Sequence, residues 1–487
     1  MLHRITVLPQ KLNIRAEAGR NLLEVLREAG ISLNAPCGGS GTCGKCKVLI
    51  DGHAQLACHT TVDRDMTVTL PEAGAFQILT DADALIPGGE NGYTLAFDIG
   101  TTTVVGNLLD RKTGVPLSCL GTPNPQRTYG ADVVSRIRHG IQGHSNALTG
   151  SIRECLEQLT QQLCREAGVP SEEIRLVSLV GNPAMQQFTL GLPVDNLAKV
   201  PFAPILTAME QIPAGKVLKL WENAELLIVP DIAGFVGADT VACILAADMD
   251  RLHEMTLLVD IGTNGEMVLG NREKMIACSA AAGPALEGAG IRFGMGGRDG
   301  AIDHVYLEGG TLQCTVIGGG KAEGICGSGL IDAVAAALDA GWLNARGKIL
   351  TGDGLIHLTE DIFLDQEDIR QVQLAKGAIA AGIQLMADAM SISFSEVNAV
   401  YLAGAFGCYM DPRSACRIGL LPKELEDKIT AIGNAARQGA NILACSLEGE
   451  KRVERILART EALELSTLPG FPRCFAKNMR FADGNMD

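Results

Sequence analysis

One internal repeat restricts the fold of this 487-residue chain more than any other feature. Residues 94–108 and 256–269 each consist of an apolar stretch that leads into Asp-Ile-Gly-Thr and a second apolar stretch that follows it; the two aspartates, Asp98 and Asp260, stand 162 residues apart. Two apolar stretches around a tight turn predict two paired strands. Helical stretches at 153–166, 329–340 and 371–390 alternate with apolar runs. The repeat therefore predicts two α/β lobes around a cleft.

The turns of the repeat have the composition of a phosphate site. Glycine allows backbone amides to approach phosphate oxygens, threonine adds hydroxyl donors, and aspartate can hold hydrated Mg²⁺. A single Asp-x-Gly turn is common, whereas two copies at the spacing of a lobe are a specific signal. We therefore predict that a phosphate chain is held from both sides by Asp98, Gly100, Thr101, Thr102, Thr103, Asp260, Gly262, Thr263, Asn264 and Gly265.

Four of the fifteen cysteines are grouped near the start of the chain, at Cys37, Cys43, Cys46 and Cys58. Three glycines between the first two let the backbone wrap a cluster and direct amides at its sulfurs. Zinc also takes four cysteines, but its sites are usually built from two CxxC pairs, and Cys37 and Cys58 do not form one. Reduced thiols are the other alternative. We predict an iron–sulfur cluster here, and we expect the eleven scattered cysteines to be reduced and buried.

The loop that carries these cysteines resembles that of the 2Fe-2S ferredoxins, with the five-residue first gap of the adrenodoxin-like branch. Residues 1–73 around it show strand-like alternation, a helix at 21–29, a hairpin turn at Asp51-Gly52 and a strand at 66–70, which is a β-grasp-like outline. Residues 74–92 are rich in Gly, Asp and Pro and are expected to form a linker.

The repeated turns resemble the two phosphate motifs of the acetate and sugar kinase, Hsp70 and actin superfamily. That resemblance implies an ATPase whose two ribonuclease-H-like lobes close over ATP, with lobe I at 93–255 and lobe II at 256–487. The segment 400–407 resembles the adenosine motif of the superfamily, which implies a binding role for Gly404, Ala405, Phe406 and Gly407. Gly327 and Ser328 precede a helix and could also serve the nucleotide, although such a turn is more often a plain helix start.

The net charge and the hydropathy of the sequence argue against a nucleic-acid partner, secretion and a membrane span. The formal net charge is −15 and no run of Lys and Arg occurs, which argues against a nucleic-acid partner. The first residues lack the apolar core of a signal peptide, and no stretch approaches the ~20 apolar residues that span a bilayer. We expect a cytoplasmic protein with no membrane association.

A ferredoxin followed by an ATPase resembles the reductive activators of corrinoid proteins, and the resemblance covers nearly the whole chain. It implies the ATP-dependent one-electron reduction of a corrinoid protein in a methyltransferase system from Co(II) to Co(I), an external electron donor and a homodimer. A ferredoxin-type cluster near about −400 mV can fall short of the cobalt. Each ~100 mV of deficit costs about 2.3 kcal/mol per electron, which ATP can supply. Asp239 and Glu266 are candidates for orienting the attacking water or the metal, alongside Asp98 and Asp260.

Two departures from the family and three alternatives remain open. Larger members carry a further domain between the ferredoxin and the ATPase, and others carry C-terminal cysteine clusters, whereas here only Cys474 lies near the end. The alternatives are an ATP-dependent electron donor to another iron–sulfur or redox enzyme, an ATP-binding electron-carrier scaffold without turnover, and a small-molecule kinase with an accessory ferredoxin.

Overall fold

The computed structural model describes most of the chain, namely residues 2–8, 12–29, 31, 46–70, 90–130, 132–288, 290–407, 409–446 and 448–482. Cys37, Cys43 and most of the predicted linker lie outside these residues. Within the described part, no helix is both long enough and apolar enough to cross a bilayer.

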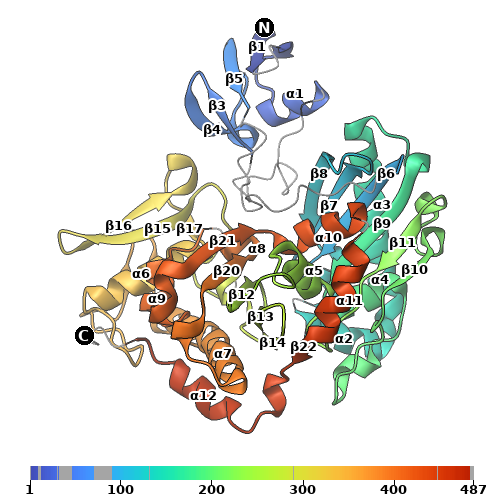
Figure 1. Ribbon diagram of the computed structural model, residues 1–487. Helices are drawn as coiled ribbons and strands as arrows, with labels where there is room; N and C mark the ends of the chain where they lie inside the picture. Colours follow the sequence, from blue (N-terminus) through green and yellow to red (C-terminus); the bar gives the residue numbers. More distant parts are fainter. Residues whose placement is uncertain are drawn as a thin grey trace.

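The N-terminal unit is a five-stranded sheet with one helix against it (Figure 1). The strand order is β2-β1-β5-β3-β4; β1 pairs antiparallel with β2 and parallel with β5. Its small core is made only of side chains from this unit, among them Ile5, Val7, Leu22 and Val48. The predicted β-grasp is thereby confirmed, with elements β1 (Leu2–Leu8), β2 (Leu12–Glu17), α1 (Leu22–Glu28), β3 (Lys47–Ile50), β4 (His53–Leu56) and β5 (Met66–Thr69).

The first lobe is a six-stranded sheet in the order β10-β11-β9-β6-β7-β8. The repeat segment forms the antiparallel pair β6 and β7, and β9 joins β6 in parallel after a helical crossover. The elements are β6 (Tyr93–Ile99), β7 (Thr103–Asp110), β8 (Pro116–Pro123), α2 (Val133–His139), α3 (Ser145–Ala167), β9 (Ile174–Gly181), α4 (Pro183–Leu190), β10 (Glu210–Pro213), β11 (Glu225–Ile228) and α5 (Ala238–Ala246).

The second lobe repeats this topology, because β12, β13 and β14 form an antiparallel meander and β20 joins β12 in parallel. The sheet order is β21-β20-β12-β13-β14-β22. Its main elements are β12 (Thr256–Ile261), β13 (Gly265–Gly270), β14 (Met275–Ala280), α6 (Gly327–Asp339), α7 (Gln366–Met390), β20 (Ala399–Ala403), α8 (Gly404–Gly407), α9 (Pro412–Arg417), β21 (Ile429–Gly433), α10 (Ala435–Cys445), α11 (Gly449–Arg459), β22 (Thr460–Ala462) and α12 (Phe471–Asn478).

Two small sheets complete this half of the molecule. A three-stranded sheet contains β15 (Ala301–Glu308), β16 (Thr311–Val316) and β17 (Gly324–Ile325), and a two-stranded sheet contains β18 (Ile356–His357) and β19 (Phe363–Leu364). The predicted two-lobed α/β fold is confirmed, and the sequence repeat is also a structural repeat.

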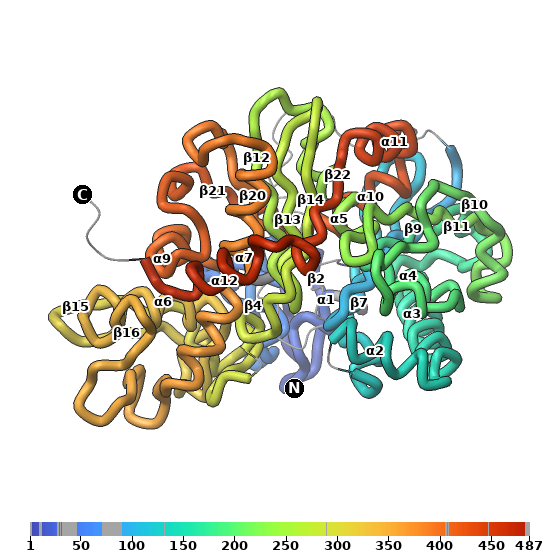
Figure 2. The backbone as a smooth tube through the Cα atoms, turned by 90° about the horizontal axis from the view of Figure 1, so that it is seen from below, coloured from blue at the N-terminus to red at the C-terminus, as the bar shows by residue number. Residues whose placement is uncertain are grey.

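Helices α5 and α10 pack together where the two lobes meet (Figure 2). The contact is so close that a Cβ on Gly439 of α10 would lie 2.1 Å from the carbonyl oxygen of Ala242 in α5. A shared apolar core surrounds this crossing and contains buried side chains of both sheets, such as Val180 and Leu258. The packing of α5 against α10 therefore joins the two lobes, in addition to the covalent connection between them.

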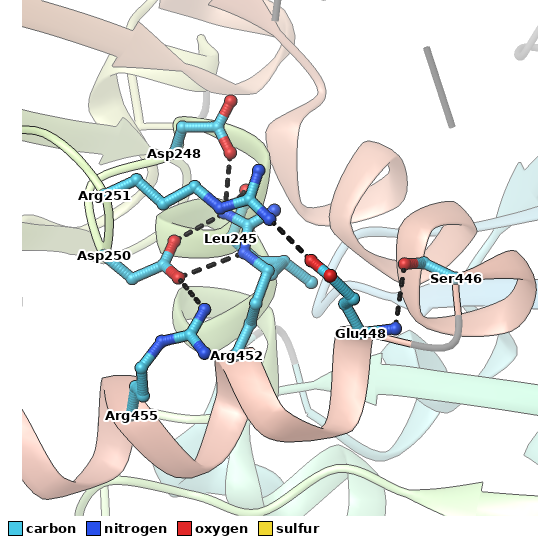
Figure 3. A network of polar contacts seen from close by, with 8 residues as sticks. All are labelled: Leu245, Asp248, Asp250, Arg251, Ser446, Glu448, Arg452 and Arg455. Carbon is cyan, nitrogen blue, oxygen red and sulfur yellow. Dashed lines mark hydrogen bonds and ion pairs between the residues drawn. The ribbon is translucent and has the colours of Figure 1, made fainter. Parts of the chain in front are cut away.

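An ion-pair network fastens α11 to the crossover that follows α5 (Figure 3). The buried Arg452 guanidinium donates to Asp248 at 2.6 Å, to Asp250 at 3.0 Å and to the carbonyl oxygen of Leu245 at 3.0 Å. Arg455, which is half exposed, reaches Asp250 at 3.3 Å. Because Arg452 and Asp250 are both buried, this network fixes the crossover from one lobe to the other.

Candidate functional site

The two Asp-Ile-Gly-Thr turns of the repeat meet in space. The hydroxyl oxygens of Thr102 and Thr263 lie 3.4 Å apart, one from each lobe. Both hydroxyls donate to the Oε2 atom of Glu287, at 3.5 Å from Thr102 and 3.0 Å from Thr263. The structure therefore brings together the two predicted phosphate turns and adds a carboxylate between them.

Side chains behind the first turn hold its backbone in place. The amide of Asn124 donates to the carbonyl oxygen of Gly100 at 2.8 Å, and Asn182 donates to the Thr101 hydroxyl at 3.1 Å. Arg136, which is fully buried, donates to the carbonyl oxygen of Thr101 at 2.6 Å. Burial lowers the pKa of Arg136 to about 10, so the group stays charged at neutral pH and supplies positive charge behind the turn.

A hydrogen bond within its own backbone closes the second turn tightly. The Gly262 amide donates to the carbonyl oxygen of Asn264 at 2.9 Å. A Cβ on Gly265, where β13 starts, would lie 2.8 Å from Ile379 of α7. In the first turn a Cβ on Gly100 would lie 2.9 Å from the carbonyl oxygen of Thr103. Glycine is thus required in both turns for reasons of space.

Four half-buried carboxylates lie beside these turns. Asp98 and Asp260 stand at the ends of β6 and β12, Asp239 lies in the first turn of α5, and Glu266 lies in β13. Burial raises the pKa of each; the negative charges of Asp98 and Asp260 also help raise the pKa of Asp239, to about 7. Burial and the charge of Asp98 raise the pKa of Asp260 to about 6. Burial is the largest cause of each shift, and a bound cation would favour the ionised form of all four groups.

Three of the four carboxylates accept a hydrogen bond from a neighbouring side chain. Asn434 donates to Asp98 at 2.9 Å, the Cys243 thiol donates to Asp260 at 3.5 Å, and Ser279 donates to Glu266 at 3.1 Å. Among the described residues no three acidic, histidine or cysteine side chains converge as a complete metal-ligand set. Mg²⁺ usually takes one or two protein carboxylates and fills its other positions with phosphate and water, so such a set is not needed to hold it.

The proposed adenosine segment adjoins the same carboxylates. Gly404 follows β20 with φ +83°, and a Cβ there would lie 2.7 Å from Oδ1 of Asp260. The backbone of Ala405, Phe406 and Gly407 continues as α8. The structure thus places the start of this segment against the end of β12, as the parallel pairing of β12 and β20 requires.

Gly327 and Ser328 form the first residues of α6. The buried Ser328 hydroxyl donates to the carbonyl oxygen of Asp303 at 2.9 Å and lies 3.2 Å from the sulfur of Cys326. In the described part of the chain, its hydrogen bonds join it to these residues and not to the carboxylates. A nucleotide role for Gly327 and Ser328 stays a prediction.

Three residues of the site lie outside the set of predicted site residues. Glu287 and Asn434 reach the turns from distant parts of the chain. Asp231 is buried, accepts from the first amide of α5 (Ala238) at 3.2 Å, and has no partner for Oδ2 among the described residues. Burial and the neighbouring Asp239 raise its pKa well above the usual range. The only sequence hint for Asp231 was its place seven residues before a helix start.

The two described cysteines of the predicted cluster lie side by side in the N-terminal unit. Cys46 precedes β3 and Cys58 lies in the 3₁₀ turn Ala57–His59, and both are buried. The Cys58 amide donates to the Cys46 sulfur at 3.4 Å, and Asn21 donates to the Cys58 carbonyl oxygen at 2.6 Å. Amide-to-sulfur bonds of this kind tune iron–sulfur clusters, so the pair fits half of a four-cysteine ligand set. Cys37 and Cys43 lie outside the described residues.

The residue after Cys58 contacts the second lobe. His59 Nδ1 lies 2.5 Å from Oδ2 of Asp299, and a cavity of about 460 Å³ beside this contact is lined by His59, Arg298, Ile317, Gly318 and Gly320, among others. The cysteine-bearing turn therefore faces the part of the second lobe that carries β15–β17 (Figure 1).

The scattered cysteines mostly lie where we expected them. Those that the structure describes form no disulfide, and most are buried, while Cys119, Cys314 and Cys474 are half-buried. Burial raises the pKa of several of these thiols, for example that of Cys155 to about 11. They are core side chains.

Three family models match successive parts of the chain. Residues 5–69 match the 2Fe-2S iron–sulfur cluster binding domain, residues 93–252 match the RACo middle region, and residues 254–487 match the C-terminal domain of RACo, the ASKHA domain.

Similar proteins extend over most of the chain. The corrinoid activation enzyme RamQ of Eubacterium limosum is 35% identical over 423 residues, which cover 81% of this chain and 71% of that protein. The Co(II) methylated amine-specific corrinoid protein reductase of Methanosarcina barkeri is 28% identical, over 71% of this chain and 68% of its own. The solved structure of a reductive activator for corrinoid, iron-sulfur protein superposes with a TM-score of 0.72 at 26% identity, covering 99% of both chains.

Proposed function

The chain belongs to the family of reductive activators of corrinoid proteins, and on that premise we propose that it uses ATP to return a corrinoid protein of a methyltransferase system from Co(II) to Co(I), one electron per cobalt. The observation that carries this proposal is the meeting of Thr102, Thr263 and Glu287 between the two lobes, in a chain whose N-terminal unit pairs Cys46 with Cys58. A phosphate site and an electron-transfer site thus lie in one molecule.

In this proposal Cys37, Cys43, Cys46 and Cys58 hold a 2Fe-2S cluster. Such a cluster supplies a single electron at low potential when bound. The protein contributes the burial of Cys46 and Cys58, the amide bond between them, and the bond from Asn21 that fixes the carbonyl of Cys58. These contacts fix Cys46 and Cys58 relative to each other.

The residues of the lobes bind and orient Mg²⁺-ATP. The backbone of the two turns and the hydroxyls of Thr101, Thr102, Thr103 and Thr263 contact the phosphates, and Arg136 supports the first turn from behind. Asp98 and Asp260 hold the hydrated metal, whose positive charge favours the ionised form of two carboxylates whose pKa values burial raises. Asp239 and Glu266 orient water, and 404–407 contact the adenosine. Gly262, Asn264 and Gly265 shape the second turn.

Closure of the two lobes couples ATP binding to electron transfer. Because ATP contacts both lobes, its binding free energy favours one relative placement of them over the other. The contact between His59 and Asp299 transmits that placement to the cysteine-bearing turn. The partner is a corrinoid protein, and an external donor, a homodimer and a cytoplasmic location complete the proposal; no nucleic acid takes part.

The test is anaerobic and spectroscopic. Reduced, cluster-loaded protein is mixed with a Co(II) corrinoid protein and Mg-ATP, and the Co(I) absorbance is followed. We expect Co(I) only when ATP is present. Asp260→Ala should abolish the ATP-dependent signal and leave the cluster spectrum intact, while Asp427→Ala, an exposed aspartate of the same lobe, should behave as wild type.

Two results would contradict the proposal. ATP hydrolysis without Co(I), tried with several corrinoid proteins, would assign the electron to another redox protein. Normal ATP dependence in Asp260→Ala would show that the nucleotide site has been placed wrongly.

A further inference from the structure

Glu287 occupies a position that none of the proposed roles uses. Its Oε2 atom accepts from Thr263 at 3.0 Å and from Thr102 at 3.5 Å, so one carboxylate oxygen bridges the two lobes. These are the hydroxyls that the proposed function assigns to the phosphates of ATP. A carboxylate and a phosphate cannot both accept the same hydroxyl protons, so the two anions compete for the same donors.

We propose that Glu287 is a positioning residue that latches the two phosphate turns together when no nucleotide is bound and releases their hydroxyls to the phosphates of a nucleoside triphosphate. This inference rests on the proposed function, because it takes the two turns as the phosphate site. It adds a carboxylate of the protein that competes with ATP for the Thr102 and Thr263 hydroxyls. ATP binding is thereby coupled to the relative placement of the two lobes.

The carboxylate sits on a rigid support. Glu287 ends the 3₁₀ turn Pro284–Glu287, which follows β14, and the neighbouring Ala285 and Leu286 are buried. Gly288 comes next with φ +85°, and a Cβ there would lie 2.8 Å from the backbone of Met295. Because the backbone around Glu287 is fixed, the latch is released by a side-chain rotation or by lobe movement.

The electrostatics of the bridge agree with this reading. Burial raises the pKa of Glu287 above its usual value, and the bonds from Thr263 and Thr102 and the charge of Arg127 oppose that shift. The two hydroxyls therefore favour the ionised carboxylate. An ionised Glu287 repels incoming phosphate and is displaced by it.

Glu287 as the base that activates water would be a different role, and kinetics separates the two. A base contributes to the chemical step, so its loss lowers kcat and leaves nucleotide affinity unchanged. A latch opposes binding, so its loss tightens affinity.

The experiment measures the Kd of Mg-AMP-PNP, a non-hydrolysable ATP analogue, by calorimetry on the full-length protein. Glu287→Gln keeps the shape and one acceptor but removes the charge, and we expect it to bind about tenfold tighter, the ratio that corresponds to one hydrogen bond to a charged group. Glu308→Gln, an exposed glutamate of β15, is the matched control and should leave the Kd unchanged. Glu287→Asp, which keeps the charge on a shorter side chain, should fall between wild type and Glu287→Gln.

A second measurement needs no nucleotide. Thermal unfolding of wild type, Thr102→Val, Glu287→Gln and the double variant forms a double-mutant cycle, and a bridge between the lobes predicts that the two losses are not additive. Additive losses, or a Kd that is unchanged or weaker in Glu287→Gln, would overturn the latch. If wild type bound no AMP-PNP at all, the proposed function would fail instead, and the thermal cycle would still decide whether the bridge exists.

Discussion

Asn434 joins the start of α10 to the carboxylate of the first turn, because its side-chain amide donates to Oδ2 of Asp98 at 2.9 Å while its side-chain oxygen accepts from the Arg437 amide. One side chain thus caps a helix that follows β21 and touches a residue at the end of β6. A second link, from Asn107 to Asn441 at 2.8 Å, lies further along the same helix. The two links hold α10 against the sheet of the first lobe, with Asn434 at Asp98.

The carboxylates make the stability of the protein depend on pH in an unusual direction. The pKa of Asp239 is raised to about 7 and that of Asp260 to about 6, so the folded protein keeps protons that the unfolded chain has lost. This contribution to stability is complete below about pH 4 and is lost as pH rises toward 7. We expect Asp239→Asn to match wild type at pH 4 and to be more stable at pH 8 by on the order of 1–4 kcal/mol.

Urea unfolding at both pH values, without metal or nucleotide, checks this expectation. Asp195→Asn, an exposed aspartate, is the control and should show no pH-dependent difference. Added Mg²⁺ should narrow the gap at pH 8 because it pairs the charges. Equal stability of Asp239→Asn and wild type at pH 8 would mean that Asp239 carries no unfavourable charge.

Cys58 should be needed for the cluster and not for the ATPase. Among the described residues, the core of the N-terminal unit contains no side chain of the lobes. Loss of the cluster should therefore leave the two lobes folded. We expect Cys58→Ala to lose the visible absorbance and the bound iron and to retain ATP hydrolysis. Cys474→Ala, which changes a half-buried thiol far from this unit, serves as the control. Full iron content in Cys58→Ala would remove Cys58 from the ligand set.

Gly404 should be essential for nucleotide affinity, because its backbone has a positive φ and because no side chain fits between it and Asp260. It has φ +83°, and a Cβ would approach Asp260 to 2.7 Å. Gly341 has a similar φ of +71° and nothing within 4 Å of its Cβ position, so Gly341→Ala tests the backbone cost alone. We expect Gly341→Ala to lose about 1 kcal/mol of stability through backbone strain, and Gly404→Ala to lose more because its Cβ also meets Asp260.

Only Gly404→Ala should also bind AMP-PNP at least about tenfold more weakly, since a misplaced Asp260 no longer holds the metal. Comparable affinities in the two variants would show that the turn after β20 does not shape the site.

Arg452 should hold α11 in place far more strongly than its neighbour Arg455. Replacing Arg452 by Met removes the buried partner of Asp250 and leaves it the half-exposed Arg455; loss of a buried partner costs about 3–5 kcal/mol in similar pairs. Arg455→Met removes a half-exposed pair to the same carboxylate and should cost about 0.2–1 kcal/mol. Chemical denaturation of the two variants gives the comparison, and equal losses would contradict the role assigned to the buried pair.

Local patterns predicted most of the elements. The alternation around Ile5 and Val7, the glycine turns after Asp98 and Asp260 and the long helix that ends at Met390 all depend on residues close in sequence. The resemblance between the two repeats also implied the relation between the lobes. These features could be recognised because each repeats a short physical rule, either the period of a strand or helix or the space that a turn requires.

Other parts of the site depend on contacts that no local rule describes. The packing of Gly439 on Ala242, the bridge made by Glu287 and the clamp made by Arg452 each join residues that the chain keeps far apart. Asp231 looks like an ordinary loop aspartate until the fold buries it. Pairings of this kind follow from the topology of the two lobes.

The crossing of α5 and α10 also sets the order in which the protein can mature on the ribosome. The N-terminal unit has a core of its own, so it can fold, and we expect it to take up iron, while the rest is still being translated. The first lobe cannot finish at that stage, since one face of its sheet is covered by residues 435–445. Until that helix emerges, the apolar side of α5 is bare, and the nascent chain presents chaperones with an electron carrier already folded and an ATPase still incomplete.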